Sequence, residues 1–206
     1  MVKKIPTRKP AARYHHGDLR AALVRAGLEL LRKEGFEALS LRAVARRAGV
    51  SQTAPYSHFT DKNALLAAIA AEGLRTLGSR QRACAALSDV PTEQMLAMAR
   101  TYVGMACDEP ALFQLMLGPG APEKYQSPEV DEAHREGFLH LRSVVAAVAG
   151  TGIDAPETWV AMMAAWSMVH GMAQLLTDGK ISPAMVGLQD RDQLVTLIIK
   201  AVAGPG

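Results

Sequence analysis

The chain has 206 residues, of which 49% are hydrophobic and 21% charged, and its formal net charge is +3 at pH 7. This length allows one or two domains. The two cysteines, Cys84 and Cys107, are too few for a disulfide framework, so we expect reduced thiols; a redox-sensing pair is the less favoured alternative. No apolar run approaches the ~20 residues of a membrane-spanning helix and no secretory signal follows the basic N-terminus, so we expect a cytoplasmic chain with no membrane partner.

The first predicted helix runs from about Gly17 to Lys33. Gly35 ends it, because glycine easily adopts the left-handed conformation that closes a helix. The apolar positions recur at helical spacing and form one stripe, which consists of Leu19, Leu23, Ala26, Gly27, Leu30 and Leu31. This stripe predicts that the helix packs against the elements that follow.

Residues 40–59 predict two short helices joined by a tight glycine turn. Ser40 is a good N-cap for the first helix, and Gly49 ends it. The apolar face between them consists of Leu41, Val44, Ala45 and Ala48. Two helices at this spacing can lay the second one in the major groove of DNA. The alternative is an ordinary helical corner in an all-α protein.

The second helix of the pair is predicted from Gln52 to His58, with Ser51 as its cap. Pro55 falls in the first turn, where its missing N–H costs least. Tyr56 and Phe59 supply the bulk that is expected to anchor this short helix. The side chains left to meet base edges or phosphates are Gln52, Thr53, Ser57 and His58.

Thr60 and Asp61 open a further helix that runs to about Ala86. Its apolar side consists of Leu65, Leu66, Ile69, Ala70, Gly73 and Leu77. The N-terminal part therefore predicts a three-helix core with a long connecting helix.

The charge is divided unevenly along the chain. Residues 1–82 carry 16 Lys and Arg against 6 Asp and Glu, whereas residues 83–206 carry 7 against 14. The positively charged part of the chain thus contains the two paired helices, and positive charge there would attract a polyanion such as DNA. The basic arm, residues 1–14, is expected to be disordered and either reaches a minor groove or serves only as a solvated tail.

Residues 15–77 resemble the DNA-binding domain of the TetR/AcrR family of bacterial transcriptional regulators. The glycine turn, the Tyr-x-x-Phe pair and the following lysine all fall in register. The matching residues are Gly17, Leu19, Ala26, Leu30, Leu31, Gly35, Ala45, Ala48, Gly49, Val50, Ser51, Tyr56, Phe59, Lys62 and Leu65. Residues 53–55 depart from the family pattern of a small residue, a threonine and an apolar residue, so base preference is not carried over.

The resemblance implies a homodimer that binds a near-palindromic double-stranded operator in successive major grooves roughly 34–36 Å apart. By position in the family motif, the candidates for phosphate contact are Ser40, Arg42, Tyr56, Ser57 and Lys62. The candidates for base contact are Gln52, Thr53 and His58.

Residues 78–206 predict a second helical domain, which makes the whole chain all-α. Its helices are expected from Thr92 to before Pro110, from Ala111 to Leu117, from about Pro128 to Ala149, from Pro156 to Thr177 and from about Leu188 to Ala203. The last two are more apolar than one small domain needs, so we expect them to pair with a second copy in a four-helix interface. Trp166, His170 and Gly171 resemble a TetR subgroup named for W-x-x-x-H-G.

The second domain is expected to bind a small apolar effector. The candidate lining residues are Met98, Tyr102, Phe113, Met163, Trp166 and His170. His170 has two interpretations: a hydrogen-bonded core residue, which is commoner, or a ligand contact. The helix from Asp61 to about Ala86 touches both parts and is expected to act as the lever between them.

No nucleotide-binding or serine-hydrolase motif occurs, and we expect neither an enzyme nor a cofactor. The metal-like groupings, His15 with His16 and His134 with Glu136 and His140, fall short of a zinc ligand set. The sequence thus favours a ligand-responsive repressor. The alternatives are a nonspecific nucleoid-type DNA-binding protein and an enzyme or carrier that uses only the acidic half.

Overall fold

The computed structural model describes residues 16–119 and 127–203, and the regular secondary structure within these ranges is helical, as predicted. The α-helices are α1 (His16–Glu34), α2 (Leu41–Ala48), α3 (Lys62–Ala85), α4 (Pro91–Asp108), α5 (Pro110–Leu117), α7 (Pro128–Ala149), α8 (Pro156–Thr177) and α9 (Arg191–Ala203). Short 3-10 helices form η1 (Phe36–Ala38), η2 (Ala54–Ser57) and η3 (Pro183–Val186). None of the described helices is long and apolar enough to cross a membrane. The predicted basic arm lies outside the described residues.

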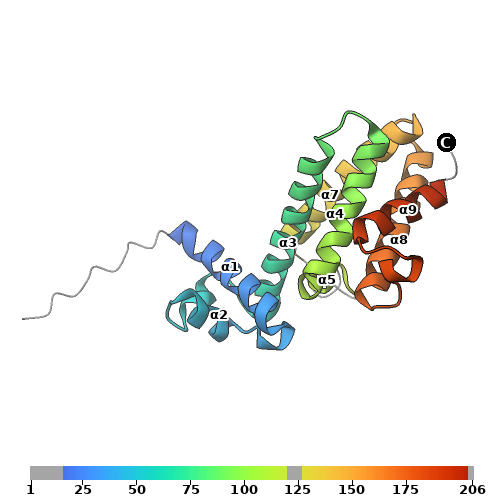
Figure 1. The fold of residues 1–206 in the computed structure, drawn as a ribbon. Coiled ribbons are helices and arrows are strands. Elements are labelled where there is room, and N and C mark those ends of the chain that lie inside the picture. Colours follow the sequence, from blue (N-terminus) through green and yellow to red (C-terminus); the bar gives the residue numbers. More distant parts are fainter. Residues whose placement is uncertain (1–15, 120–126, 204–206) are drawn as a thin grey trace, which may run out of the picture.

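The long helix α3 joins two ends of the molecule (Figure 1). At one end α3 packs against α1, close to α2 and η2, and at the other it packs against α4 and α7, which α8 and α9 cover. One apolar core extends from Leu23 in α1 to Ile199 in α9. The predicted domain boundary between residues 77 and 78 falls inside α3, and the two ends of the molecule share one core. The division into two domains therefore stays a prediction.

Proline and glycine set several helix bounds. Helix α7 begins at Pro128 and ends before Gly150, whose φ of 65° is left-handed, and α8 begins at Pro156. Proline fits a first helical position because the N–H it lacks would have no helical partner there. The predicted cap at Thr92 is wrong for the same reason, because α4 begins one position earlier, at Pro91.

Ion pairs connect α1 to the C-terminal helices. Arg20 Nη2 lies 2.6 Å from Glu129 Oε1 at the start of α7. Arg32 Nε lies 2.7 Å from Oε2 of Glu109, which stands between α4 and α5. The Oε1 of Glu109 also pairs with Nη2 of Arg80 in α3, at 3.6 Å. These contacts and the shared core fix how the N-terminal corner sits on the rest of the chain.

Candidate nucleic-acid interface and ligand cavity

Helix α2 forms the first arm of the predicted corner, as expected. The Oγ of Ser40 accepts a hydrogen bond from the N–H of Ala43 at 3.1 Å and so caps the helix. Gly49 follows its end with a φ of 71°, a left-handed conformation that costs a glycine little. Val50 is half-buried and packs against the core in the corner.

The second arm is a 3-10 helix and not the predicted α-helix from Gln52 to His58. Only Ala54–Ser57 is regular, and its backbone bonds are of the i to i+3 kind, such as Tyr56 N–H to Thr53 O at 3.2 Å, until the N–H of Phe59 donates to Pro55 O. Pro55 has no N–H to donate to Ser51, so the α-helical ladder cannot form there. The predicted Ser51 cap is also wrong, since its hydroxyl pairs with that of Thr53 at 3.2 Å.

This short arm presents a row of exposed polar side chains. Gln52, Thr53, Tyr56 and Ser57 all face solvent, whereas Phe59 is 2% exposed. The prediction that Tyr56 helps to anchor the arm is wrong, because its ring is 55% exposed and Phe59 alone enters the core. The exposed position leaves the Tyr56 hydroxyl free for the phosphate contact implied by its place in the motif.

His58 lies differently from the other base-contact candidates. Its side chain is half-buried, and its Nε2 is buried without a hydrogen-bond partner among the described residues. It lines a crevice between the corner and the start of α7, together with Arg20 and Glu129. Nothing in this geometry favours a base contact by His58, which remains a sequence prediction.

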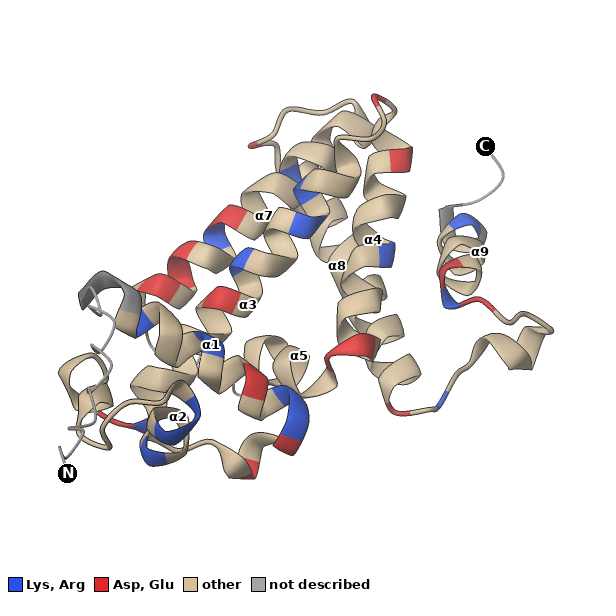
Figure 2. Cartoon of the chain, turned by 60° about the vertical axis from the view of Figure 1, so that its left-hand side comes forward, with Lys and Arg blue, Asp and Glu red and all other residues tan. Residues whose placement is uncertain are grey.

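Cationic side chains surround the corner. Arg42 and Arg46 of α2 are exposed and make no ion pair with the described residues, whereas Arg47 pairs with Glu29 at 2.7 Å. Lys62 is exposed, with its Nζ 5.8 Å from the centre of the Phe36 ring. Figure 2 shows the basic groups gathered on α2 and the neighbouring end of α1, while acidic groups mark α7. A surface of this charge suits a phosphate backbone.

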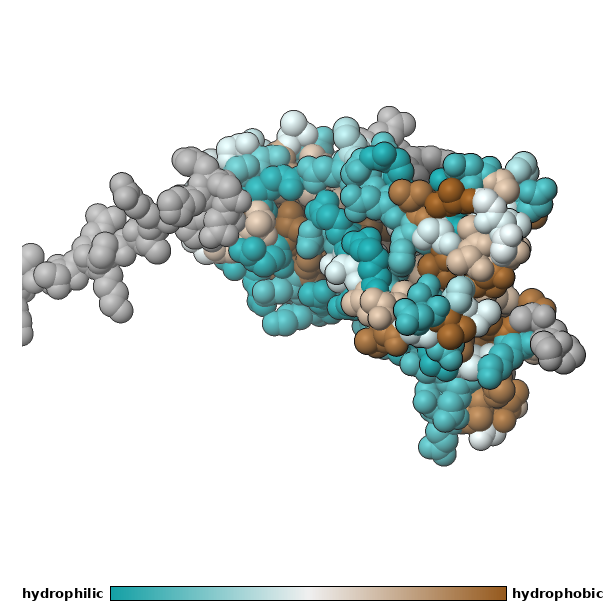
Figure 3. All heavy atoms as spheres, turned by 90° about the horizontal axis from the view of Figure 1, so that it is seen from above, coloured by the Kyte–Doolittle hydropathy of each residue, from teal (hydrophilic) through white to brown (hydrophobic). Residues whose placement is uncertain are grey.

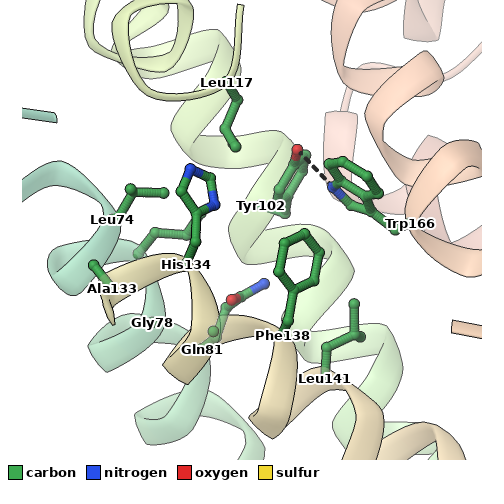
Figure 4. A pocket seen from close by; sticks show the side chains of 12 residues that line it. Leu74, Gly78, Gln81, Tyr102, Leu117, Ala133, His134, Phe138, Leu141 and Trp166 are labelled. Carbon is green, nitrogen blue, oxygen red and sulfur yellow. Dashed lines mark hydrogen bonds between the residues drawn. The ribbon is translucent and has the colours of Figure 1, made fainter. Parts of the chain in front are cut away.

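A cavity of about 70 Å³ lies between α3, α4, α7 and α8 (Figure 4). Its lining is mostly apolar. The described lining residues are Leu74, Leu77, Gly78, Gln81, Tyr102, Leu117, Ala133, His134, Gly137, Phe138, Leu141 and Trp166. A space of this size and character can hold a small apolar molecule better than a charged one.

A chain of hydrogen bonds fixes one wall of the cavity. Trp166 Nε1 donates to the Tyr102 hydroxyl at 3.2 Å, and that hydroxyl lies 2.8 Å from His170 Nδ1. Burial raises the pKa of Tyr102 to about 12, so its hydroxyl stays protonated. Burial also lowers the pKa of His170, which favours the neutral ring. A neutral ring can accept a hydrogen bond from the Tyr102 hydroxyl at Nδ1.

The predicted effector residues do not all reach this cavity. Tyr102 and Trp166 line it, and Met98 lines an adjoining void of about 40 Å³. Phe113 is 1% exposed and packs edge to face against Tyr102, with ring centres 5.2 Å apart. Met163 does not line this cavity: it is 51% exposed and lines an outer groove between α7 and α8, so its effector contact stays a prediction.

His170 also lies outside the lining of the cavity. Its bond to Tyr102 matches the interpretation as a hydrogen-bonded core residue. The ring packs against Phe113 at 5.8 Å and Trp166 at 5.9 Å, measured between centres. His170 therefore supports the cavity wall from behind.

Sequence reasoning missed the contribution of α7 to the cavity. His134, Phe138 and Leu141 follow one another at helical spacing on its inner face, and His134 was weighed only as a metal ligand. The sequence signal that could have indicated this wall is the polar His134 among the apolar inner positions of α7. Among the described residues no group of three His, Cys, Asp or Glu is placed to hold a metal, and both cysteines are free thiols.

Comparisons with known proteins agree with this architecture. A family model described as bacterial regulatory proteins, tetR family, matches residues 23–69, and one described as tetracyclin repressor-like, C-terminal domain, matches residues 95–202. A structure of a protein with unknown function from Rhodococcus sp. RHA1 has 32% identity and a TM-score of 0.72, with 91% of this chain and 95% of that chain covered.

Two curated relatives are similar over shorter stretches. Tetracycline repressor protein class C of Escherichia coli is 51% identical over 51 residues, which are 25% of this chain and 23% of that protein. HTH-type transcriptional regulator Rv1816 of Mycobacterium tuberculosis is 26% identical over 114 residues, 54% of this chain and 49% of that protein. The chain thus spans about half or less of the length of these relatives.

The family models separate the predictions. Neither description names the W-x-x-x-H-G subgroup, which remains a prediction, and nothing in the comparisons supports a nucleoid-type protein. The fold and the matched models are those of transcriptional regulators and not of enzymes. With a matched helix-turn-helix corner at one end and a matched C-terminal domain over half of its length, the chain belongs to the TetR family of DNA-binding bacterial transcriptional regulators.

Proposed function

We propose that the chain is a ligand-responsive repressor that binds a near-palindromic operator as a homodimer. The observation that carries the proposal is the corner itself, in which a capped α2 holds a short arm that exposes the side chains of Gln52, Thr53, Tyr56 and Ser57. Gln52 and Thr53 would meet base edges, and Ser40, Arg42, Tyr56, Ser57 and Lys62 would position the corner on phosphates.

The homodimer would form through α8 and α9. Apolar side chains of both helices stay exposed in one copy, including Val160 at 63%, Leu175 at 44% and Leu197 at 52%. Figure 3 shows apolar surface gathered at the end of the molecule that these helices form. Pairing this surface with a second copy would bury it and would set two corners at the spacing of successive major grooves.

The effector would act through the helices that line the cavity. Helix α3 runs from the cavity to the corner, and α7 runs from the cavity to Glu129, which holds Arg20 of α1. A ligand that favours one arrangement of these helices would change the distance between the two corners. It controls operator occupancy only by the difference in its affinity for the two arrangements.

Selection of binding sites from random double-stranded DNA tests the proposal. We expect the wild-type protein to return one near-palindromic motif, and Gln52→Ala to relax the preference at one symmetric pair of positions, because a direct base contact is lost. Recovery of no motif by the wild-type protein would contradict sequence-specific binding. An identical motif from the variant would remove Gln52 from the base contacts.

Lys62 provides a separate test of the phosphate contacts. We expect Lys62→Ala to weaken binding to every sequence and to reduce the slope of log affinity against log salt concentration by about one unit. The reason is that the variant makes one phosphate contact fewer and so releases one counterion fewer from the DNA on binding. The measurement is a salt titration on a single operator. Lys180→Ala, an exposed lysine beyond α8, is the matched control and should leave the slope unchanged.

A further inference from the structure

One nitrogen in the wall of the cavity has no partner. The Nε2 of His134 is buried and makes no hydrogen bond within the described residues. The ring stacks on Phe138, with centres 6.0 Å apart, and points into the space between Leu74 and Tyr102 (Figure 4). Buried polar atoms in proteins are nearly always paired. The ring of His134 lines the cavity, and its Nδ1 makes no hydrogen bond within the described residues either, so a molecule in the cavity can supply the partner that the ring lacks.

Two neighbouring polar groups, the Tyr102 hydroxyl and the Gln81 amide nitrogen, already have partners, whereas Gln81 Oε1 makes no hydrogen bond within the described residues. The Tyr102 hydroxyl is shared by Trp166 and His170, and Gln81 Nε2 donates to the backbone oxygen of Met98 at 3.2 Å. These bonds hold the polar groups of the wall in place without help from a ligand. His134 is therefore the one polar ring of the described wall that has no hydrogen bond, and a ligand would give it one.

The wall also restricts the charge of its occupant. None of the described lining residues is a lysine, arginine, aspartate or glutamate. Burial lowers the pKa of His134, so its ring tends to stay neutral. A buried ion without a counter-charge is strongly disfavoured. An uncharged occupant suits such a wall.

The shape of the cavity favours a compact apolar body. A methyl group added at Gly137 of α7 would meet no atom within 4 Å, and one added at Gly78 of α3 would first meet Arg82 Nη1 at 3.4 Å. These glycines keep the space between α3 and α7 open. The adjoining void of about 40 Å³ shares Gln81, Tyr102, Leu141 and Trp166 with the cavity and extends the space.

We propose that this cavity binds an uncharged, mostly apolar molecule of roughly single-ring size with one hydrogen-bonding group, and that the His134 ring binds that group through a ring nitrogen. This inference rests on the proposed effector role of the cavity. It adds a binding residue and excludes organic anions and cations as the principal ligands. Binding would give the His134 ring a hydrogen-bond partner, so the hydrogen bond is formed without breaking another.

The test uses phenol and toluene, which have nearly the same shape and differ in one hydroxyl. Their dissociation constants are measured on the full chain by ligand-observed NMR or thermal shift, for the wild type and for His134→Leu. We expect the preference for phenol relative to toluene to fall about tenfold in the variant, because only phenol loses a hydrogen bond.

His140→Leu is the matched control. His140 lies on the same helix and has a buried, unpartnered Nε2, but it does not line the cavity. Its replacement should leave the phenol preference unchanged. Gly137→Leu should fill the open space and abolish binding of both probes, and a cooperative melt for each variant shows that the fold is intact.

Three outcomes would overturn the inference: no binding of either probe by the wild type, an unchanged preference in His134→Leu, or an equal loss in His140→Leu. These measurements need no DNA. A failure of the proposed operator function would appear in the selection from random DNA, and so the two failures are distinguishable.

Discussion

Replacing Phe59 by alanine is expected to lower the free energy of unfolding by about 3–5 kcal/mol, the usual cost of removing a large buried aromatic side chain. Phe59 is 2% exposed, and the Arg20 guanidinium carbon lies 5.5 Å from its ring centre. Its N–H also donates to Pro55 O at 2.9 Å and closes the short arm. Loss of the ring should therefore release the corner as well as weaken the core. Denaturant unfolding measures the first effect, and operator binding the second.

Tyr56→Ala is the matched control from the same Tyr-x-x-Phe motif. Because the ring of Tyr56 is exposed, its removal should change the stability by no more than about 0.5 kcal/mol. It should nevertheless weaken operator binding, since a hydrogen bond to a charged phosphate is lost. Equal stabilities of the Phe59 and Tyr56 variants would contradict the assignment of Phe59 as the anchor of the arm.

Val160→Glu is expected to separate the dimer and to reduce operator affinity by about 10²–10⁴-fold, because each half-site would then be bound alone. The side chain lies on the exposed apolar face of α8, so a glutamate there leaves the monomer core intact and places a charge in the proposed interface. Sedimentation gives the mass, and binding to an operator with two half-sites gives the affinity.

Leu87→Glu provides the control for this substitution. Leu87 is 86% exposed in the turn after α3 and belongs to neither α8 nor α9, and its replacement should alter neither mass nor affinity. A Val160→Glu protein that stays dimeric at micromolar concentration would show that α8 does not form the interface.

Sequence patterns predicted the helices well where proline and glycine mark both ends. The bounds of α7 and α8 agree with the predicted ranges, because Pro128, Pro156 and Gly150 fix local backbone conformations independently of packing. The same kind of reasoning was wrong for the second arm of the corner. There Pro55 was placed correctly in a first turn, but its effect on the hydrogen bonds of a segment this short was underestimated.

The ligand cavity was harder to predict because it depends on how four helices meet. An apolar stripe identifies the inner face of a helix but does not say which residues of that face leave a gap. Met163 and Trp166 both belong to the predicted apolar face of α8, yet Met163 lines only the outer groove, whereas Trp166 lines both the groove and the cavity. The wall depends on Gly78 and Gly137, whose missing side chains create space only after α3 and α7 have packed.

The shared core has a consequence for exchanging sensor halves between regulators of this kind. Gly73 of α3 sits so close to α5 that an added methyl group would meet Leu112 Cδ1 at 2.9 Å, and Glu109 before α5 holds both Arg32 and Arg80. A chimera joined near residue 77 would confront this close-fitting seam with a foreign α5. A hybrid biosensor built on this DNA-binding end should therefore retain α5 and Glu109, or redesign both sides of the seam together.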